Sequence, residues 1–341
     1  MRRPRVKVEG DGFYHVVSRI GGKRFLIDEK EKAILLGMIR AAAAFSGVEV
    51  YTFAVMSNHF HLLVRVPRRR EVDDRELQRR MAALYGAPKF LKVLEKWEKW
   101  TKRDQGSRAE EEKARLRARM YDLSQFCKTF KEAYTQDYNR RHGNTGTIWE
   151  GRFKSILLEG SRRTLMTVAG YIHLNPVRAA MVERAEDAEN AGYGAACQGD
   201  TRAQAGLMTL VKKVYGAKDA TWAQARAACK CVIEGNEPSC EGAAASARDG
   251  DVEPGASAKK DDATGSAERD ERGRSLPPKT LRGLLRRRVA GFLHGGALGG
   301  DRFLKRVAGC FPPRVRRRAE GLVDRCAFLG FSSAAGVRGA S

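Results

Sequence analysis

The feature that most constrains the fold is a run of β-branched, aromatic and other apolar residues from Val50 to Val66, which carries two histidines one residue apart. Side chains alternate between the two faces of an extended strand, so His59 and His61 emerge on one face while Phe60 lies on the other. We therefore expect one strand that directs two imidazoles outward. Neutral imidazole is the commonest metal-ligating side chain. The alternative is a half-buried strand whose exposed face carries two histidines with no shared role.

The segments before this run predict a β-α-β unit. Residues 12–20 are rich in β-branched and aromatic residues and end at a Gly-Gly pair, which predicts a strand. Asp28 can cap a helix whose apolar residues keep helical spacing up to Gly47. This order indicates an α+β fold, a ferredoxin-like antiparallel sheet with helices on one face. His15 lies on the first strand; a lone histidine there is usually structural, although a neighbouring strand can bring it near the pair.

Two further elements follow a charged stretch. Apolar residues between positions 122 and 142 recur every three or four residues, which predicts a helix ended by Gly143. Residues 146–158 predict a strand or hairpin, on which Arg152 and Lys154 form a basic face suited to DNA. Both elements are expected to complete the sheet domain.

A last helix of this domain begins after Ser161, which can cap it. Tyr171 and Asn175 are four residues apart and fall on the shoulder of its apolar stripe, which places a phenol and an amide side by side. Pro176 disfavours helical geometry at the preceding residue, so we expect Asn175 at the end of the helix. Taken alone, Tyr171 is more simply explained as a packing residue.

The charge of the chain points to a polyanionic partner. Its 64 Lys and Arg against 41 Asp and Glu leave a net charge of +23, which favours nucleic acid first and an anionic membrane surface second. No apolar run approaches the roughly 18 residues of a membrane span, and the first residues lack an apolar signal core. We expect a cytoplasmic protein that does not enter a membrane, a monomer or a homodimer.

Composition divides the chain into segments. We expect a sheet domain over residues 1–185, interrupted by a charged helical insertion at 68–118. A flexible or weakly structured linker is expected over 186–275, with helices near 207–215 and 222–232. Residues 276–341 form a basic segment whose expected structure is a small helical core. Between Lys279 and Arg318 it has twelve Lys or Arg and one acidic residue, which favours DNA binding over a basic solvated tail. The arginines expected to contact DNA there are Arg286, Arg287, Arg288, Arg316, Arg317 and Arg318.

Three motifs occur in order: MSNHFHLLV from Met56, GTIWEGRFKS from Gly146 and YIHLNPVRAAMV from Tyr171. Together they resemble the REP-associated branch of the single-tyrosine HUH transposases, relatives of the insertion-sequence TnpA proteins. The resemblance covers about residues 10 to 185 and implies the HUH endonuclease fold. It also implies a catalytic role for the domain over residues 1–185 and a nucleoid-associated bacterial protein. It implies that His59 and His61 hold Mg²⁺ or Mn²⁺, that Asn175 supplies a third metal ligand and that Tyr171 is the nucleophile.

The function expected from this resemblance is metal-dependent nicking and strand transfer of single-stranded DNA at hairpin or repeat sequences. The reaction would pass through a covalent phosphotyrosine, which conserves the bond energy needed for rejoining in transposition or recombination. The alternative is a catalytically silent DNA-binding or regulatory protein derived from a transposase. RNA processing on the same fold is less favoured, because it would need exposed aromatic residues on the central strands.

Overall fold

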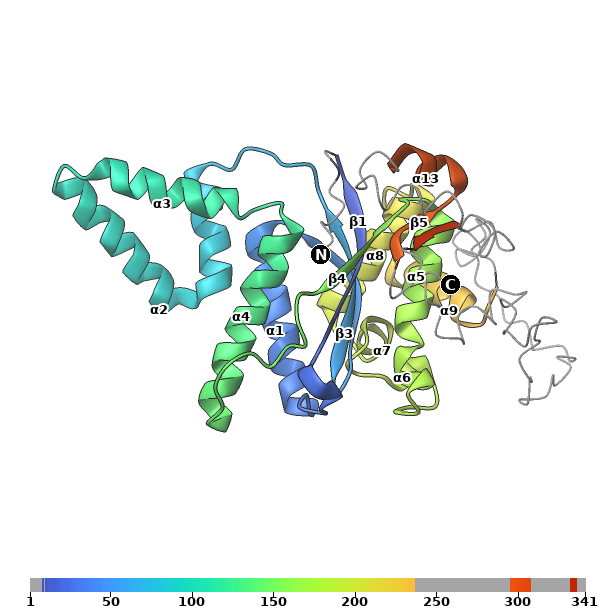
Figure 1. Ribbon diagram of the computed structural model, residues 1–341. Helices are drawn as coiled ribbons and strands as arrows, with labels where there is room; N and C mark the ends of the chain where they lie inside the picture. Colours follow the sequence, from blue (N-terminus) through green and yellow to red (C-terminus); the bar gives the residue numbers. More distant parts are fainter. Residues whose placement is uncertain (1–7, 9, 237–294, 308–331, 336–341) are drawn as a thin grey trace, which may run out of the picture.

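The computed structural model describes residues 8, 10–236, 295–307 and 332–335. Its centre is a six-stranded sheet (Figure 1). The strands are β1 (Gly12–Arg19), β2 (Glu49–Val55), β3 (His59–Val66), β4 (Lys154–Leu158), β5 (Gly295–Gly299) and β6 (Ser332–Ala335), in the spatial order β2-β3-β1-β4-β5-β6. The first four strands pair with one another in antiparallel fashion, and their order is that of a ferredoxin-like sheet. The predicted α+β fold is therefore confirmed.

The run from Val50 to Val66 forms a hairpin rather than the single strand expected. The chain turns at residues 56–58, and Met56 N donates to His59 O over 2.8 Å. Ser57 and Asn58 are typical turn residues. The flanking apolar residues continue on both sides without interruption, so the run alone did not reveal the turn.

Two helices cover one face of the sheet, α1 (Glu29–Ser46) and α4 (Leu123–His142) (Figure 1). Both begin and end as the sequence predicts: Asp28 and Asp122 accept from the third backbone N–H beyond them, and Gly47 and Gly143 adopt left-handed geometry at the C-termini. Phe60 of β3 packs between Phe130 and Trp149 on this side. The apolar face of the histidine strand is therefore the face that α4 buries.

The other face is also covered, which corrects the expectation of helices on one face only. It carries α5 (Arg162–His173), α7 (Gly192–Cys197), α8 (Thr201–Tyr215) and α9 (Trp222–Ile233), with a short helix α6 (Asn175–Arg178) after α5 (Figure 1). Three-residue 3₁₀ turns lie at Gly21–Lys23 and Ala185–Asp187. In Figure 1, α5 stands beside the sheet with α8 and α9 around it, so this helix has packing partners on several sides.

The predicted linker is therefore wrong for residues 186–236. The helices expected near 207–215 and 222–232 exist as α8 and α9, but they belong to the main core, to which they contribute Leu207, Leu210 and Val232. Small residues make this packing possible. A Cβ atom on Gly206 would lie 2.8 Å from the carbonyl oxygens of both Val50 and Tyr51, so only glycine allows α8 to approach β2 this closely. Residues 237–275 of the predicted linker lie outside the described part of the chain.

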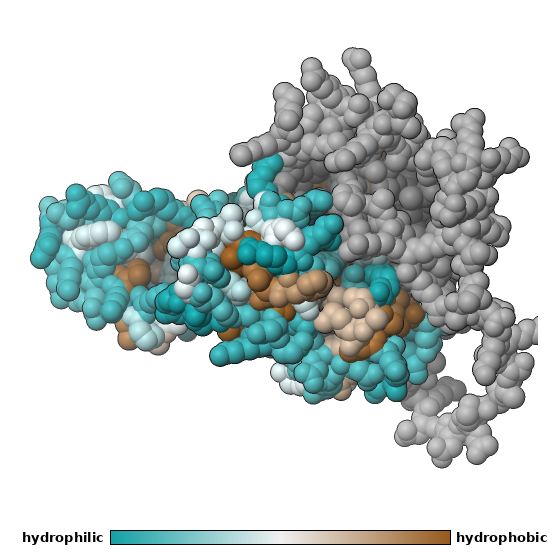
Figure 2. All heavy atoms as spheres, turned by 60° about the horizontal axis from the view of Figure 1, so that its bottom comes forward, coloured by the Kyte–Doolittle hydropathy of each residue, from teal (hydrophilic) through white to brown (hydrophobic). Residues whose placement is uncertain are grey.

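The charged insertion projects from the sheet domain as two helices, α2 (Asp74–Lys102) and α3 (Gly106–Ala118) (Figure 1). We call this pair the arm. Its surface is mostly hydrophilic in Figure 2, where it extends to the left, and it encloses a small core of its own that includes Met81, Trp97 and Leu116. Gly86, with φ of 70° and ψ of 162°, breaks α2 into two halves, and Pro88 opens the second half.

The C-terminal region adds to the edge of the sheet. Strand β5 pairs in parallel with β4, β6 pairs antiparallel with β5, and α13 (Asp301–Val307) follows β5. The sequence predicted helices in this basic segment, whereas the structure has two strands there, β5 and β6. The six arginines predicted to contact DNA in this segment lie outside the described residues. Within the described residues, no helix is both long and apolar enough to cross a membrane.

Candidate active site

Three histidines and a tyrosine gather between the sheet and α5. His59 and His61 lie on β3. His15 lies on the neighbouring β1, across from Leu63, and Tyr171 comes from the last turns of α5. The ring centre of Tyr171 is 6.0 Å from those of His15 and His61, edge-on to both. The rings of His59 and His61 are 5.0 Å apart. The structure thus brings the predicted nucleophile against the predicted metal-binding pair.

These side chains are buried, whereas the sequence predicted two outward imidazoles and a tyrosine at the margin of the core. His61 and Tyr171 are each 1% exposed and His59 is 9% exposed. The cause is the second helical layer: α5 is held between the sheet and α8–α9, so every residue from Thr164 to His173 is buried. A helical wheel of α5 alone cannot show this, because periodicity reveals one buried face and not a second covering layer.

Hydrogen bonds orient the two imidazoles of the pair. Asn58 Oδ1 lies 2.6 Å from Nδ1 of His59, and since an amide oxygen can only accept, this nitrogen carries the proton. Nδ1 of His61 lies 2.9 Å from Nε2 of His15, so one of these two rings donates to the other. When His61 donates, the lone pairs of both His59 and His61 are on Nε2. Partners of this kind fix the tautomer of metal-binding histidines.

Asn175 begins the helix after α5, as Pro176 led us to expect. Its Nδ2 donates to the carbonyl oxygens of Tyr171, at 3.1 Å, and Ile172, at 3.4 Å. The amide nitrogen is therefore used in closing the C-terminus of α5. Oδ1 is therefore the atom of this side chain that can bind a metal ion.

Arg178 is a site residue that sequence reasoning missed. Its guanidinium carbon lies 4.0 Å from the centre of the Tyr171 ring. Its Nη2 donates over 2.6 Å to the carbonyl oxygen of Tyr171. The spacing of seven residues, two helical turns, was a signal for this contact, but Pro176 obscured it by interrupting the helix.

Two other tyrosines, Tyr134 and Tyr138, lie on the opposite face of the sheet, on α4. Tyr134 is fully buried and donates to Glu31 over 2.9 Å, and burial raises its pKa well above the ordinary value, with a further contribution from the Glu31 carboxylate. Tyr138 stacks on His142 with 4.1 Å between the ring centres. Neither faces the histidine pair, because the sheet separates α4 from it.

The residues predicted to bind a cation differ in their donor atoms. His59 and His61 offer imidazole nitrogens, and Asn175 offers an amide oxygen. Over the described residues, no group of three His, Cys, Asp or Glu side chains is arranged to hold a metal ion. Nε2 of His15 faces His61 in a hydrogen-bonded pair, so this nitrogen is already engaged.

The predicted basic face on β4 is at the surface. Arg152, in the loop before β4, and Lys154, its first residue, are both exposed. Of the segment 146–158, only residues 154–158 form a strand of the sheet, while Trp149 makes an isolated bridge to Ile20. No contact joins these two cations to the histidine site among the contacts described.

The fold and the site define a class: a ferredoxin-like α+β domain that packs a tyrosine against a pair of histidines. Residues 11–75, about a fifth of the chain, match the family described as IS200-like transposases. This segment includes His15, His59 and His61, so the predicted resemblance is confirmed over it.

One solved structure is similar over a longer range, that of a REP-associated tyrosine transposase bound to a REP hairpin. The identity is 15%, the match covers 57% of this chain and 84% of the other, and the TM-score is 0.36. A comparison with curated proteins finds no match.

Proposed function

We propose that this protein nicks and rejoins single-stranded DNA at hairpin or repeat sequences, with Tyr171 as the nucleophile. The observation that carries the proposal is the edge-on packing of the Tyr171 ring against His61, beside His59. The net charge of +23 supports a nucleic acid substrate, and the match of residues 11–75 to IS200-like transposases supports a DNA-processing role.

In the proposed step, the phenolic oxygen of Tyr171 attacks the phosphorus of a DNA phosphodiester. A bond from phosphorus to tyrosine forms while the bond to one deoxyribose oxygen breaks, and the phenol proton is balanced by the proton that the released hydroxyl gains. The phosphotyrosine keeps the energy of the broken bond, so a DNA hydroxyl can reverse the step at the same or another end.

His59, His61 and Asn175 would hold the divalent cation. When bound, Mg²⁺ or Mn²⁺ withdraws charge from the non-bridging phosphate oxygens and favours attack at phosphorus. Asn58 and His15 orient the two imidazoles, and Arg178 holds the tyrosine ring. Positioning of this kind contributes to catalysis by removing the entropy cost of bringing the reacting groups together.

The test is covalent capture. The full chain is incubated with a labelled hairpin oligonucleotide and Mn²⁺ or Mg²⁺, and denaturing electrophoresis detects a protein–DNA adduct. We expect an adduct with the unmodified protein and with Tyr134→Phe and Tyr138→Phe, but none with Tyr171→Phe or in EDTA. Each substitution removes one hydroxyl and keeps the ring, so the three variants are matched in packing. An adduct that persists in Tyr171→Phe would refute the assignment.

The burial of the site favours a second function, DNA binding without catalysis. Tyr171 and His61 are almost inaccessible, so a phosphodiester reaches them only if α5 and α6 move. A silent transposase descendant would bind hairpin DNA but form no adduct under any metal condition. The same capture experiment, combined with a binding measurement, distinguishes the two functions.

A further inference from the structure

The second half of α2 and the residue that follows it carry a row of cations along the arm. Lys89, Lys92, Lys96, Lys99 and Arg103 follow one another at alternating intervals of three and four residues. At 100° per residue they fall within about 80° of the helix circumference and extend over about 20 Å. We call these five residues the basic row.

Most of the basic row is exposed and uncompensated. Lys96 pairs with Glu112, but the other four are exposed, and no ion pair involves Lys89, Lys92 or Lys99 within the part of the chain that the structure describes. Several acidic residues of the arm instead form ion pairs with lysines outside the basic row. Examples are the ion pairs Glu98–Lys102, Glu110–Lys113 and Asp74–Lys113. Besides Glu112, Glu95 borders the basic row, three residues after Lys92 and four before Lys99.

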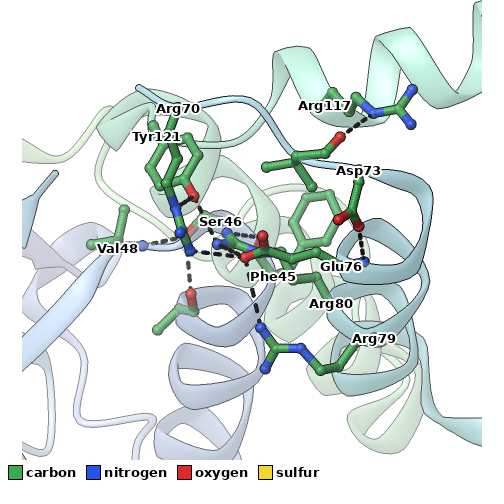
Figure 3. A network of polar contacts seen from close by, with 12 residues as sticks. Phe45, Ser46, Val48, Arg70, Asp73, Glu76, Arg79, Arg80, Arg117 and Tyr121 are labelled. Carbon is green, nitrogen blue, oxygen red and sulfur yellow. Dashed lines mark hydrogen bonds and ion pairs between the residues drawn. The ribbon is translucent and has the colours of Figure 1, made fainter. Parts of the chain in front are cut away.

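The arm holds the basic row in a fixed orientation. α3 returns along α2, and Trp97, buried between them, donates to Glu112 over 2.9 Å. At the base of the arm, the buried Arg80 donates to Tyr121 over 2.8 Å and to the carbonyl oxygen of Phe45, at the end of α1, over 3.3 Å (Figure 3). Glu76 accepts from Arg80 over 2.6 Å. A solvated helix with no partner would not need this buried attachment to the sheet domain.

We propose that the basic row binds the phosphate backbone of double-stranded DNA, the stem of the hairpin substrate; this rests on the proposed function. Cations one helical turn apart, about every 5 Å, can neutralise successive phosphates of one strand. An anionic membrane is less suited, because an interfacial helix needs bulky apolar residues beside its cations. Here Val93, Trp97 and Trp100 pack into the core of the arm.

The test removes three charges from the basic row in the full chain. Lys89→Gln, Lys92→Gln and Lys99→Gln are combined, and the control combines Lys212→Gln, Lys218→Gln and Lys230→Gln, exposed lysines of the α8–α9 region. Binding to a hairpin oligonucleotide and to an unpaired oligonucleotide of equal length is measured against salt concentration. Circular dichroism verifies that both variants are folded.

We expect the arm variant to bind the hairpin more weakly, with the slope of log K against log salt reduced by about 3, one for each lysine. Affinity for the unpaired oligonucleotide should stay unchanged. An unreduced slope, or an equal loss in the control, overturns the inference. The inference is also overturned if the arm variant loses binding to phosphatidylserine vesicles but keeps its binding to DNA. If the unmodified protein binds the stem through the basic row yet forms no adduct, the inference stands and the proposed function fails.

Discussion

The guanidinium carbon of Arg178 lies 4.0 Å from the centre of the Tyr171 ring, and the same side chain donates to the backbone carbonyl of that tyrosine. One residue thus contacts both the ring and the main chain of the proposed nucleophile. The arginine lies on α6 and the tyrosine on α5, so this contact also fixes the turn between the two helices.

From this contact we expect Arg178→Gln to slow adduct formation by about two- to thirtyfold, since a cation over an aromatic ring contributes about 0.5 to 2 kcal/mol. Arg178→Lys should recover part of the loss, because it restores the cation but not the planar stacking. The measurement is the single-turnover rate at saturating DNA. Unchanged rates in both variants would show that the contact is structural only.

The pair formed by His15 and His61 predicts an effect on metal affinity. His15→Phe keeps a ring but removes the hydrogen-bond partner of His61, and loss of such a partner typically weakens metal binding by about 10- to 100-fold. His15→Gln should weaken it less, since an amide can still bond to His61. Isothermal titration with Mn²⁺ in the absence of DNA measures this directly.

The control for this experiment is Thr52→Val, which removes the hydrogen bond of another buried histidine, His173, on the same face of the sheet. Its Mn²⁺ affinity should match that of the unmodified protein. Thermal denaturation shows whether each variant is folded. If His15→Phe binds Mn²⁺ as tightly as the control does, His15 has no part in orienting His61.

Glu31 predicts how stability depends on pH. Burial would raise its pKa, but hydrogen bonds from Arg141, His142 and Tyr134 outweigh burial and lower the pKa to about 2, from 4.5. A carboxylate with a lowered pKa in the folded state stabilises the protein above pH 4.5, and this contribution is lost as the pH falls towards 2.

We therefore expect Glu31→Gln to lower the free energy of unfolding by about 2 to 3 kcal/mol at pH 7 and by much less near pH 3. Urea denaturation at both pH values measures the two differences. Asp137→Asn is a useful comparison, because Asp137 also binds Arg141 but lies nearer the surface. A difference between Glu31→Gln and the unmodified protein that does not change with pH would contradict the prediction.

The second helical layer predicts where the chain can be shortened. A chain ending after residue 236 retains α7, α8 and α9 and should fold, whereas one ending near residue 190 loses them and exposes the apolar residues of β2 that they cover. Far-ultraviolet circular dichroism and a cooperative thermal transition report folding. A cooperative transition in the shorter chain would show that α7–α9 are dispensable for the sheet.

The parts of the fold that the sequence could predict are those set by local chemistry. Asp28 and Ser161 cap their helices through side-chain oxygens, and Gly47 and Gly143 end helices through left-handed geometry, so the boundaries of α1, α4 and α5 could be read directly. The alternation that placed His59 and His61 on one face is likewise local.

What could not be predicted depends on packing between distant segments. The Ala- and Gly-rich segment after residue 186 has few large apolar residues. Small residues such as Gly206 nevertheless let its helices approach the sheet closely enough to bury those few apolar side chains. That layer makes α5 an internal helix and hides the candidate site. The contacts of His15 with His61 and of Arg178 with Tyr171 also depend on strand register and on the turn after α5.

The parallel pairing of β5 with β4 has a consequence for synthesis of the chain. β4 ends at Leu158 and its outer partner begins at Gly295, so more than a hundred residues emerge from the ribosome between the two. During that interval one edge of the sheet presents unpaired backbone groups, and such an edge can pair with a second nascent chain. Slow translation beyond residue 236 would lengthen this exposure, so aggregation during expression should depend on translation rate.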